Sequence, residues 1–139
     1  MNSSHREKVL EMLKNSKTIA VIGMKDNGSE TAYRIPNYMS KHGYKIYPVN
    51  PKNAGKEVLG EVFVSKVNDL KIPIDLVDVF RRPEFLTGHA KEILNMNPLP
   101  KYVWFQLGIS NDEAARMLEE KGIEVIQDEC IMVEHSKYM

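Results

Sequence analysis

Short apolar runs alternate with stretches of helical spacing along the whole chain, and this alternation is the feature that most constrains the fold. Runs such as TIAVIG at 18–23 and IDLVDVF at 74–80 are almost continuously apolar. Such runs are typical of parallel strands that are buried on both faces, and parallel strands are usually joined by crossover helices. The sequence therefore predicts an α/β fold, a doubly wound and mainly parallel sheet of about five to six strands with helices on both faces.

Glycine, proline and capping residues predict the limits of these elements. Ser29 is the expected N-cap of the second helix and Gly43 its expected end, and Pro36 predicts either an irregular first turn or a later start. Asn111 or Ser110 is expected to cap a later helix. Strands are expected at 19–22, 44–49, 62–64, 74–80, 102–106 and 123–126, and helices at 4–13, 29–43, 83–95, 111–121 and from 130 onward.

The composition indicates one globular domain. With 139 residues, 42% of them hydrophobic, the chain is expected to form a single domain over 1–139 with an N-terminal helix within 1–15. The 19 basic and 19 acidic residues cancel, so no overall field attracts nucleic acid or an anionic membrane. The sequence shows neither a signal peptide nor an apolar stretch of about 20 residues. A single cysteine, Cys130, fits a cytoplasmic location.

Gly23 follows the first expected strand and opens a polar loop. A strand that ends at glycine before a helix points free backbone N–H groups forward, and phosphate is their typical ligand. A dinucleotide site would show G-x-G-x-x-G and an acidic residue closing the second strand, whereas this chain has GMKDNG and Asn50-Pro51. NAD is therefore disfavoured. Two interpretations of Gly23 stay open, a phosphate-binding turn and a tight turn without a ligand.

Basic residues gather in the connections at the carboxyl edge of the predicted sheet. Lys52 stands where a dinucleotide site would have a carboxylate, and Arg81 and Arg82 directly follow a buried run. Together with Lys25 and Arg34 they can neutralise several phosphates in a protein of zero net charge. Taken singly, each also fits a solvated surface charge.

Other candidates lie near the ends of later strands. Gln106 closes a strand whose Trp104 and Phe105 are assigned to the core, and its amide can hydrogen-bond an amide-rich ligand at a low desolvation cost. Cys130 has two interpretations, a small buried hydrophobe and a thiol with chemistry of its own. The histidines lack metal-ligand spacing and no G-x-S-x-G elbow is present, so neither a metal site nor a hydrolase is expected.

A series of sequence blocks spans nearly the whole chain after the first helix. The blocks are IAVIG at 19–23, YRI at 33–35, YPVNP at 47–51, VLGE at 58–61, DLVDVFRRPE at 75–84, VWFQLG at 103–108 and CIMVEH at 130–135. In this order they resemble the small stand-alone CoA-binding proteins. These are relatives of the CoA-binding domain in the succinyl-CoA synthetase alpha subunit and in NDP-forming acyl-CoA synthetases. The resemblance implies a Rossmann-like fold.

The same resemblance implies that coenzyme A binds at the carboxyl-end edge of the sheet. The loop 23–29 would lie under the pyrophosphate, Lys52 would meet the ribose 3′-phosphate, and Gln106 would face the pantetheine arm. Cys130 would be placed for a reversible mixed disulfide with the coenzyme A thiol. One departure is Met24-Lys25, where family members often carry Ser or Ala. The expected cofactor-binding residues are Gly23, Met24, Lys25, Ser29, Arg34, Val49, Asn50, Pro51, Lys52, Phe80, Arg81, Arg82, Gln106 and Gly108.

The expected function is binding of coenzyme A or an acyl-CoA without catalysis by this chain. In the synthetases further domains complete the reaction, and because this chain ends at Met139 we expect that it does not complete it alone. The first alternative is a subunit or small enzyme of acyl-CoA metabolism that acts with a partner chain, and a homodimer is the other expected assembly. The second alternative is a Rossmann-like domain for NAD(P) or another nucleotide.

Overall fold

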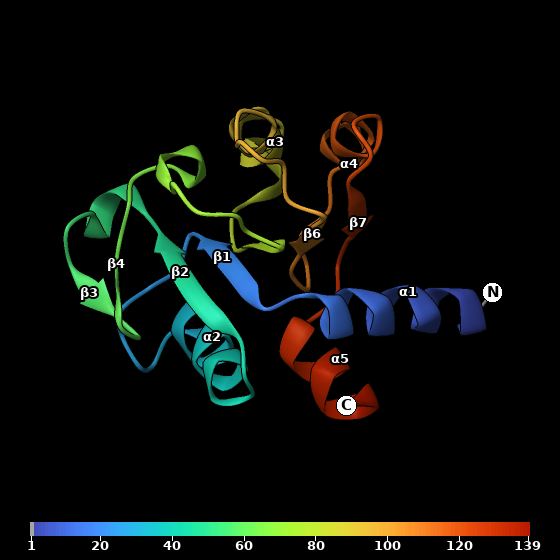
Figure 1. Cartoon of the computed structure of the whole chain (residues 1–139), viewed down its shortest axis with the longest axis horizontal. Helices are drawn as coiled ribbons and strands as arrows, with labels where there is room; N and C mark the ends of the chain where they lie inside the picture. The colour runs from blue at the N-terminus through green and yellow to red at the C-terminus, as the bar shows by residue number, and fades with distance from the viewer. Residues whose placement is uncertain (1) are drawn as a thin grey trace.

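The computed structural model describes residues 2–139 as three layers, with helices on both faces of a parallel sheet (Figure 1). Its five strands stand in the order β2-β1-β5-β6-β7, and every neighbouring pair is parallel, so the predicted Rossmann-like α/β fold is confirmed. The strands are β1 (Thr18–Ile22), β2 (Lys45–Val49), β5 (Leu76–Val79), β6 (Tyr102–Phe105) and β7 (Glu124–Ile126). The helices are α1 (Asn2–Asn15), α2 (Thr31–Lys41), α3 (Leu86–Leu94), α4 (Asp112–Glu119) and α5 (Ile131–Tyr138).

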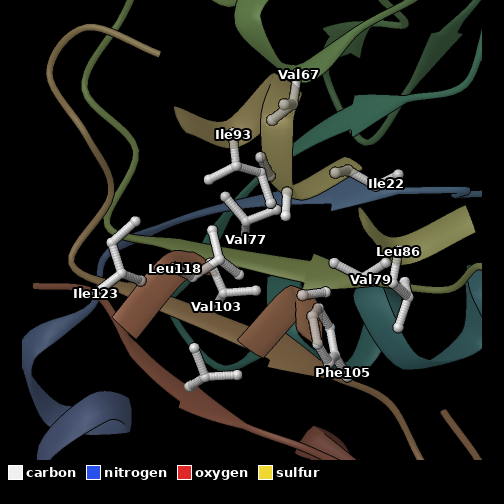
Figure 2. Packing of buried hydrophobic residues seen from close by; sticks show 14 of the residues in the cluster. Ile22, Val67, Val77, Val79, Leu86, Ile93, Val103, Phe105, Leu118 and Ile123 are labelled. Atoms are coloured by element: carbon white, nitrogen blue, oxygen red, sulfur yellow. The ribbon is translucent and has the colours of Figure 1, made fainter. Parts of the chain in front are cut away.

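The strands send alternate side chains into two hydrophobic clusters. On one face, Val77 and Val103 pack with Ile93 of α3 and Leu118 of α4 (Figure 2). On the opposite face, Trp104 belongs to a second cluster with side chains of α1, α2 and α5. Each fully buried aliphatic or aromatic side chain of this size contributes about 1.5–3 kcal/mol. The apolar runs in the sequence are nearly continuous because both faces of the sheet are covered.

The start of α2 differs from the prediction. Glu30, not Ser29, occupies the N-cap position, so the assignment of Ser29 as the cap is wrong. The backbone N–H and the hydroxyl of Ser29 instead donate to Asn27 Oδ1, at 3.0 and 2.9 Å. The Asn27 side chain thus orders the loop before the helix, as asparagine commonly does in turns.

Pro36 lies inside α2 and leaves one helical carbonyl free. Proline has no N–H, so the oxygen of Ala32, four residues earlier, lacks its usual helical partner. The backbone N–H of Lys25 donates to that oxygen at 3.3 Å. The loop after β1 is therefore tied to the helix that follows it.

The segment after β2 forms a hairpin beside the main sheet. Strands β3 (Glu57–Val58) and β4 (Glu61–Val62) pair antiparallel around Leu59 and Gly60, which both have positive φ, as type I′ hairpin turns require. The strand expected at 62–64 does not join the sheet, and Val64 makes only an isolated bridge to Val49. The main sheet thus has five strands, at the lower end of the predicted range.

The connections on the α3 and α4 side are close to the prediction. The helix expected from Pro83 divides into a 3-10 turn, η3 (Pro83–Phe85), and α3, while further 3-10 turns are η1 (Pro51–Asn53) and η2 (Val67–Asp69). Asn111, one of the two residues predicted as caps, is the N-cap of α4, since its Oδ1 accepts from the Ala114 N–H at 3.0 Å. No helix within residues 2–139 is both long and apolar enough to cross a membrane.

Asp78 is a buried carboxyl group in the middle of β5. It pairs in register with Val21 and Trp104 and is 1% exposed. Its Oδ1 has no hydrogen-bond partner among the described residues. Burial raises the pKa of this carboxyl well above its ordinary value, and the Val79 N–H opposes the shift only in part. The acid is therefore held in its neutral form over a wider pH range in the folded chain than in the unfolded one.

Asp78 predicts a measurable pH dependence of stability. Because its pKa is raised on folding, its contribution is greatest below the unfolded pKa of about 3.9 and is lost as pH rises toward the folded pKa. Asp78→Asn removes the titrating group, so we expect the free energy of unfolding of the natural protein to fall relative to that of the variant as pH rises from acid to neutral. Urea denaturation of both proteins across this range measures the difference. Parallel curves would contradict the assignment.

Candidate functional site

The neighbouring strands β1 and β5 end side by side near the centre of the sheet, and the connections that follow them run toward opposite edges of the sheet. From β1 it passes through α2 to β2 on one side, and from β5 it passes through α3 to β6 on the other. The Phe80 N–H donates to the Ile22 oxygen at 2.9 Å and extends the pairing to the strand ends. In doubly wound folds the crevice beyond such a switch point is where ligands bind.

Gly23 shapes this crevice because no other residue fits there. Its φ is 82°, which favours glycine, and a Cβ atom at this position would lie 2.3 Å from the backbone oxygen of Phe80. Its N–H donates to the Val49 oxygen at 2.8 Å. The backbones that follow β1, β2 and β5 therefore come together at one point.

Asn50 joins the loops that follow β1 and β2. Its side-chain Nδ2 donates to the Met24 carbonyl at 2.9 Å, and its Oδ1 accepts from the Lys52 N–H at 3.0 Å. The residue is 6% exposed. The Asn50 amide thus forms the hydrogen bonds that join these two loops, and it places no negative charge beside the crevice.

A basic cavity of about 500 Å³ opens directly in front of these loops. Arg81 extends over the Phe85 ring, with its guanidinium carbon 4.6 Å from the ring centroid. None of the described residues that line the cavity is acidic, and no direct ion pair to its lysines and arginines is found among the described residues. The lining residues are Gly23, Lys25, Asn50, Lys52, Phe80, Arg81, Arg82 and Phe85.

A small cavity of about 170 Å³ adjoins the basic cavity and shares Gly23, Asn50 and Arg81 with it. Arg81 Nε donates to His89 Nε2 at 3.2 Å, and since arginine cannot accept a hydrogen bond, the other ring nitrogen of His89 carries the proton and donates to Glu92 Oε1 at 3.1 Å. This chain of bonds holds Arg81 between the two cavities. The small cavity is lined by Ile22, Gly23, Val49, Asn50, Pro51, Ser65, Lys66, Arg81, His89 and Glu92.

An apolar cavity of about 310 Å³ lies on the α2 and α5 side of the same edge and shares Phe80 with the basic cavity. Among the described residues that line it, Arg34 alone is charged, and Arg34 Nη2 donates to Thr31 Oγ1 at 3.2 Å. Gln106 Oε1 accepts from the Ile131 N–H at 3.1 Å. The lining residues are Thr31, Arg34, Ile35, Phe80, Gln106, Leu107, Ile109, Cys130 and Met132.

Most of the residues expected from the sequence line one of these three neighbouring cavities, and three do not. The Met24 side chain is completely buried in the core, although its carbonyl accepts from Asn50. Ser29 is exposed and bonded to Asn27. The Gly108 N–H donates to Asp128 Oδ1 at 2.6 Å, and this glycine, with φ of 81°, shapes the turn after β6.

The structure adds lining residues that the sequence interpretation did not single out. His89 and Glu92 are three residues apart on α3, a spacing that places two side chains on one helix face and gave a signal that could have been used. Ser65 and Lys66 come from the irregular segment before η2, where no periodic pattern marks them. Within residues 2–139, no group of three or more His, Cys, Asp or Glu side chains is placed to hold a metal ion.

The fold and the edge site together define a Rossmann-like domain whose switch-point crevice is basic at its centre. The family model described as CoA binding domain matches residues 17–136. The chain therefore belongs to this family of CoA-binding domains.

Known relatives agree with this membership. YneT of Bacillus subtilis (strain 168) is 42% identical over 136 residues, which cover 98% of each chain. A solved structure from Thermus thermophilus, cell-free ID.343, superposes with a TM-score of 0.91 at 40% identity and covers 96% of this chain and 98% of its own. The alpha subunit of the ADP-forming acetate–CoA ligase I of Pyrococcus furiosus is 40% identical over 72 residues, 50% of this chain and 15% of the subunit.

The close approach at Gly23 predicts a specific loss of stability in Gly23→Ala. Gly55→Ala is the matched control, since Gly55 has φ of 89° but open space around its Cβ position. The control is expected to cost roughly 1–2 kcal/mol, from backbone strain alone. Gly23→Ala is expected to cost a further ~1–3 kcal/mol, because the Phe80 carbonyl must move. Urea denaturation measures both variants. Equal midpoints and slopes would contradict the prediction, because they would mean that the Phe80 carbonyl moves away from the new Cβ atom without loss of stability.

Proposed function

We propose that this chain binds coenzyme A, or an acyl-CoA, across the three neighbouring cavities at the carboxyl edge of its sheet, without catalysis of its own. The observation that carries the proposal is the order of the cavities. The small cavity shares Gly23, Asn50 and Arg81 with the basic cavity, and the basic cavity shares Phe80 with the apolar one. Coenzyme A has its planar base, its phosphates and its uncharged thiol arm in the same order.

The basic cavity suits the phosphates of this ligand. Lys25, Lys52, Arg81 and Arg82 surround it, and charge-assisted hydrogen bonds from such groups are shorter and stronger than those between neutral groups. The zero net charge of the chain makes this concentration of positive charge a local feature. We assign Lys52 to the ribose 3′-phosphate, because it follows Asn50 at the end of β2, where a carboxylate would repel that group.

The apolar cavity suits the pantetheine arm. Phe80, Ile109 and Met132 offer apolar contact to its carbon atoms, and Gln106 offers an amide to its amide groups. Loop 23–29 would lie under the pyrophosphate, and Val49 and Pro51, which line the small cavity, would border the adenosine part. We also propose a cytoplasmic location, where reduced coenzyme A would meet the unpaired Cys130.

A second function is an enzyme of acyl-CoA metabolism that works with a partner chain, and the similarity to part of an ADP-forming acetate–CoA ligase alpha subunit favours it over other enzymes. Turnover of acetyl-CoA or another short acyl-CoA by the purified chain alone would contradict the proposal of binding without catalysis. Turnover only after a second chain is added would support the partner function. A second copy of this chain is the other partner to test, by measuring the mass in solution.

Calorimetry with coenzyme A, dephospho-coenzyme A, NADP and ATP tests the ligand and the role of Lys52 together. We expect coenzyme A to bind most tightly and dephospho-coenzyme A to bind more weakly by about 1–3 kcal/mol, the size of a hydrogen bond to a charged group. In Lys52→Ala this difference should shrink toward zero, since the group that meets the 3′-phosphate is gone.

Lys56→Ala is the matched control for this experiment. Lys56 lies four residues further along, pairs with Asp26 at 3.8 Å and lines none of the three cavities. It should keep the preference for coenzyme A over dephospho-coenzyme A. Equal affinity of the natural protein for both ligands would refute the Lys52 assignment, and tighter binding of NADP would refute the proposed ligand.

A further inference from the structure

The apolar cavity brings a thiol and a free amide donor to the end of the proposed binding path. We propose that Cys130 exchanges thiol for disulfide with the disulfide form of a pantetheine-type thiol, coenzyme A disulfide being the nearest example, and that Gln106 positions the incoming arm. The chain would then hold one half of the disulfide covalently. This inference rests on the proposed function, because the same cavities must first admit the coenzyme.

Gln106 points to a ligand in this cavity. The residue is 3% exposed, lies at the end of β6 and lines the cavity. Its Oε1 is fixed by the Ile131 N–H, which needs an acceptor, so its Nε2 is the atom left to face the cavity. No hydrogen bond from Nε2 is found among the described residues, so this donor is open to the cavity. A carbonyl group on a ligand in the cavity would satisfy it.

Cys130 lies beside this donor on the same cavity wall. It is the single cysteine of the chain, it is partly exposed, and it stands at the N-cap position of α5. The next residue, Ile131, carries the N–H that fixes Gln106, so the thiol and the amide are held by one turn of backbone. With no second cysteine in the chain, a disulfide at Cys130 must form with another molecule.

The walls of the cavity select the kind of disulfide. Of the described residues in these walls, Arg34 alone carries a charge, and most of the others are apolar. An uncharged arm with amide groups loses little on entering such a cavity, whereas the ionised ends of glutathione would lose their hydration without enough partners. Leu107 is 68% exposed at the rim, so the departing half of the disulfide has open solvent beside it.

The exchange balances without any other reactant. The Cys130 thiol gives its proton to solvent, and the thiolate sulfur attacks one sulfur of the coenzyme A disulfide. A new bond forms between Cys130 Sγ and that sulfur, while the original sulfur–sulfur bond breaks and its electron pair leaves with the other coenzyme A as a thiolate, which takes up a proton. Cys130 is oxidised and one coenzyme A is reduced. A free thiol reverses the step.

Intact-mass spectrometry of the full chain tests this step. The natural protein, incubated with coenzyme A disulfide, is expected to gain the mass of one coenzyme A and to lose it on reduction, whereas Cys130→Ser should gain nothing. The adduct should form roughly tenfold or more faster with coenzyme A disulfide than with glutathione disulfide, because of the desolvation cost above. Equal rates with the two disulfides would overturn the proposal by showing an accessible thiol without selection.

Gln106→Glu separates positioning from a merely structural role. Glutamate keeps an oxygen for the Ile131 N–H but removes the donor that faces the cavity. The control disulfide is 2-hydroxyethyl disulfide, which has no amide groups. In the natural protein, coenzyme A disulfide should form its adduct faster than this control does. In Gln106→Glu we expect the ratio of the two rates to fall about tenfold, the effect of losing one well-placed hydrogen bond. Thermal unfolding checks that the variant is folded. An unchanged ratio would overturn the role of Gln106.

Calorimetry of the natural protein with reduced coenzyme A, in the presence of a phosphine reductant, distinguishes this inference from the proposed function. If reduced coenzyme A binds tightly but coenzyme A disulfide gives no adduct in the mass spectrum, the exchange is overturned and the proposed function stands. Absence of binding under reducing conditions would overturn the proposed function, and this inference with it.

Discussion

The contact between the backbones of Gly23 and Phe80 is the constraint on which the rest of the site depends. It closes the two central strands against each other at their carboxyl ends, where a side chain would lie 2.3 Å from the Phe80 oxygen. Each of the three cavities includes Gly23, Phe80 or both in its walls. A single close approach of two strands thus fixes how the small, the basic and the apolar cavity lie relative to one another.

Charge is concentrated at this point in a protein that has none overall. Equal numbers of acidic and basic residues give a formal charge of zero, yet the basic cavity carries two lysines and two arginines and no described acidic residue. The arrangement attracts an anion of limited size without attracting polyanions over long distances, because separated surface charges are screened within about 10 Å at moderate salt. The neutral Asn50 at the end of β2 is part of this arrangement, since it bonds both neighbouring loops without a negative charge.

The sequence predicted the fold well because burial on both faces leaves a strong local pattern. Runs such as 74–80 show it directly, and position alone narrowed the cap of α4 to Asn111 or Ser110, of which the structure shows Asn111. The hairpin at β3 and β4 was missed because two-residue strands carry no period, and Ser29 was misassigned because Asn27 competes for its hydrogen bonds. Most of the residues singled out from family resemblance and strand order line the cavities. The pair of His89 and Glu92 was missed because its meaning depends on Arg81, which only the folded chain brings near.

Pro36 has a consequence that reaches beyond its own helix. A residue usually regarded as a defect in a helix supplies the acceptor that anchors the Lys25 backbone, and with it the basic side chain that follows β1. Replacing this proline with a better helix former would restore an N–H that competes for the same oxygen. An engineer who sets out to strengthen α2 at this position would therefore loosen the turn in front of it, so that local optimisation of one element would disorder a wall of the basic cavity.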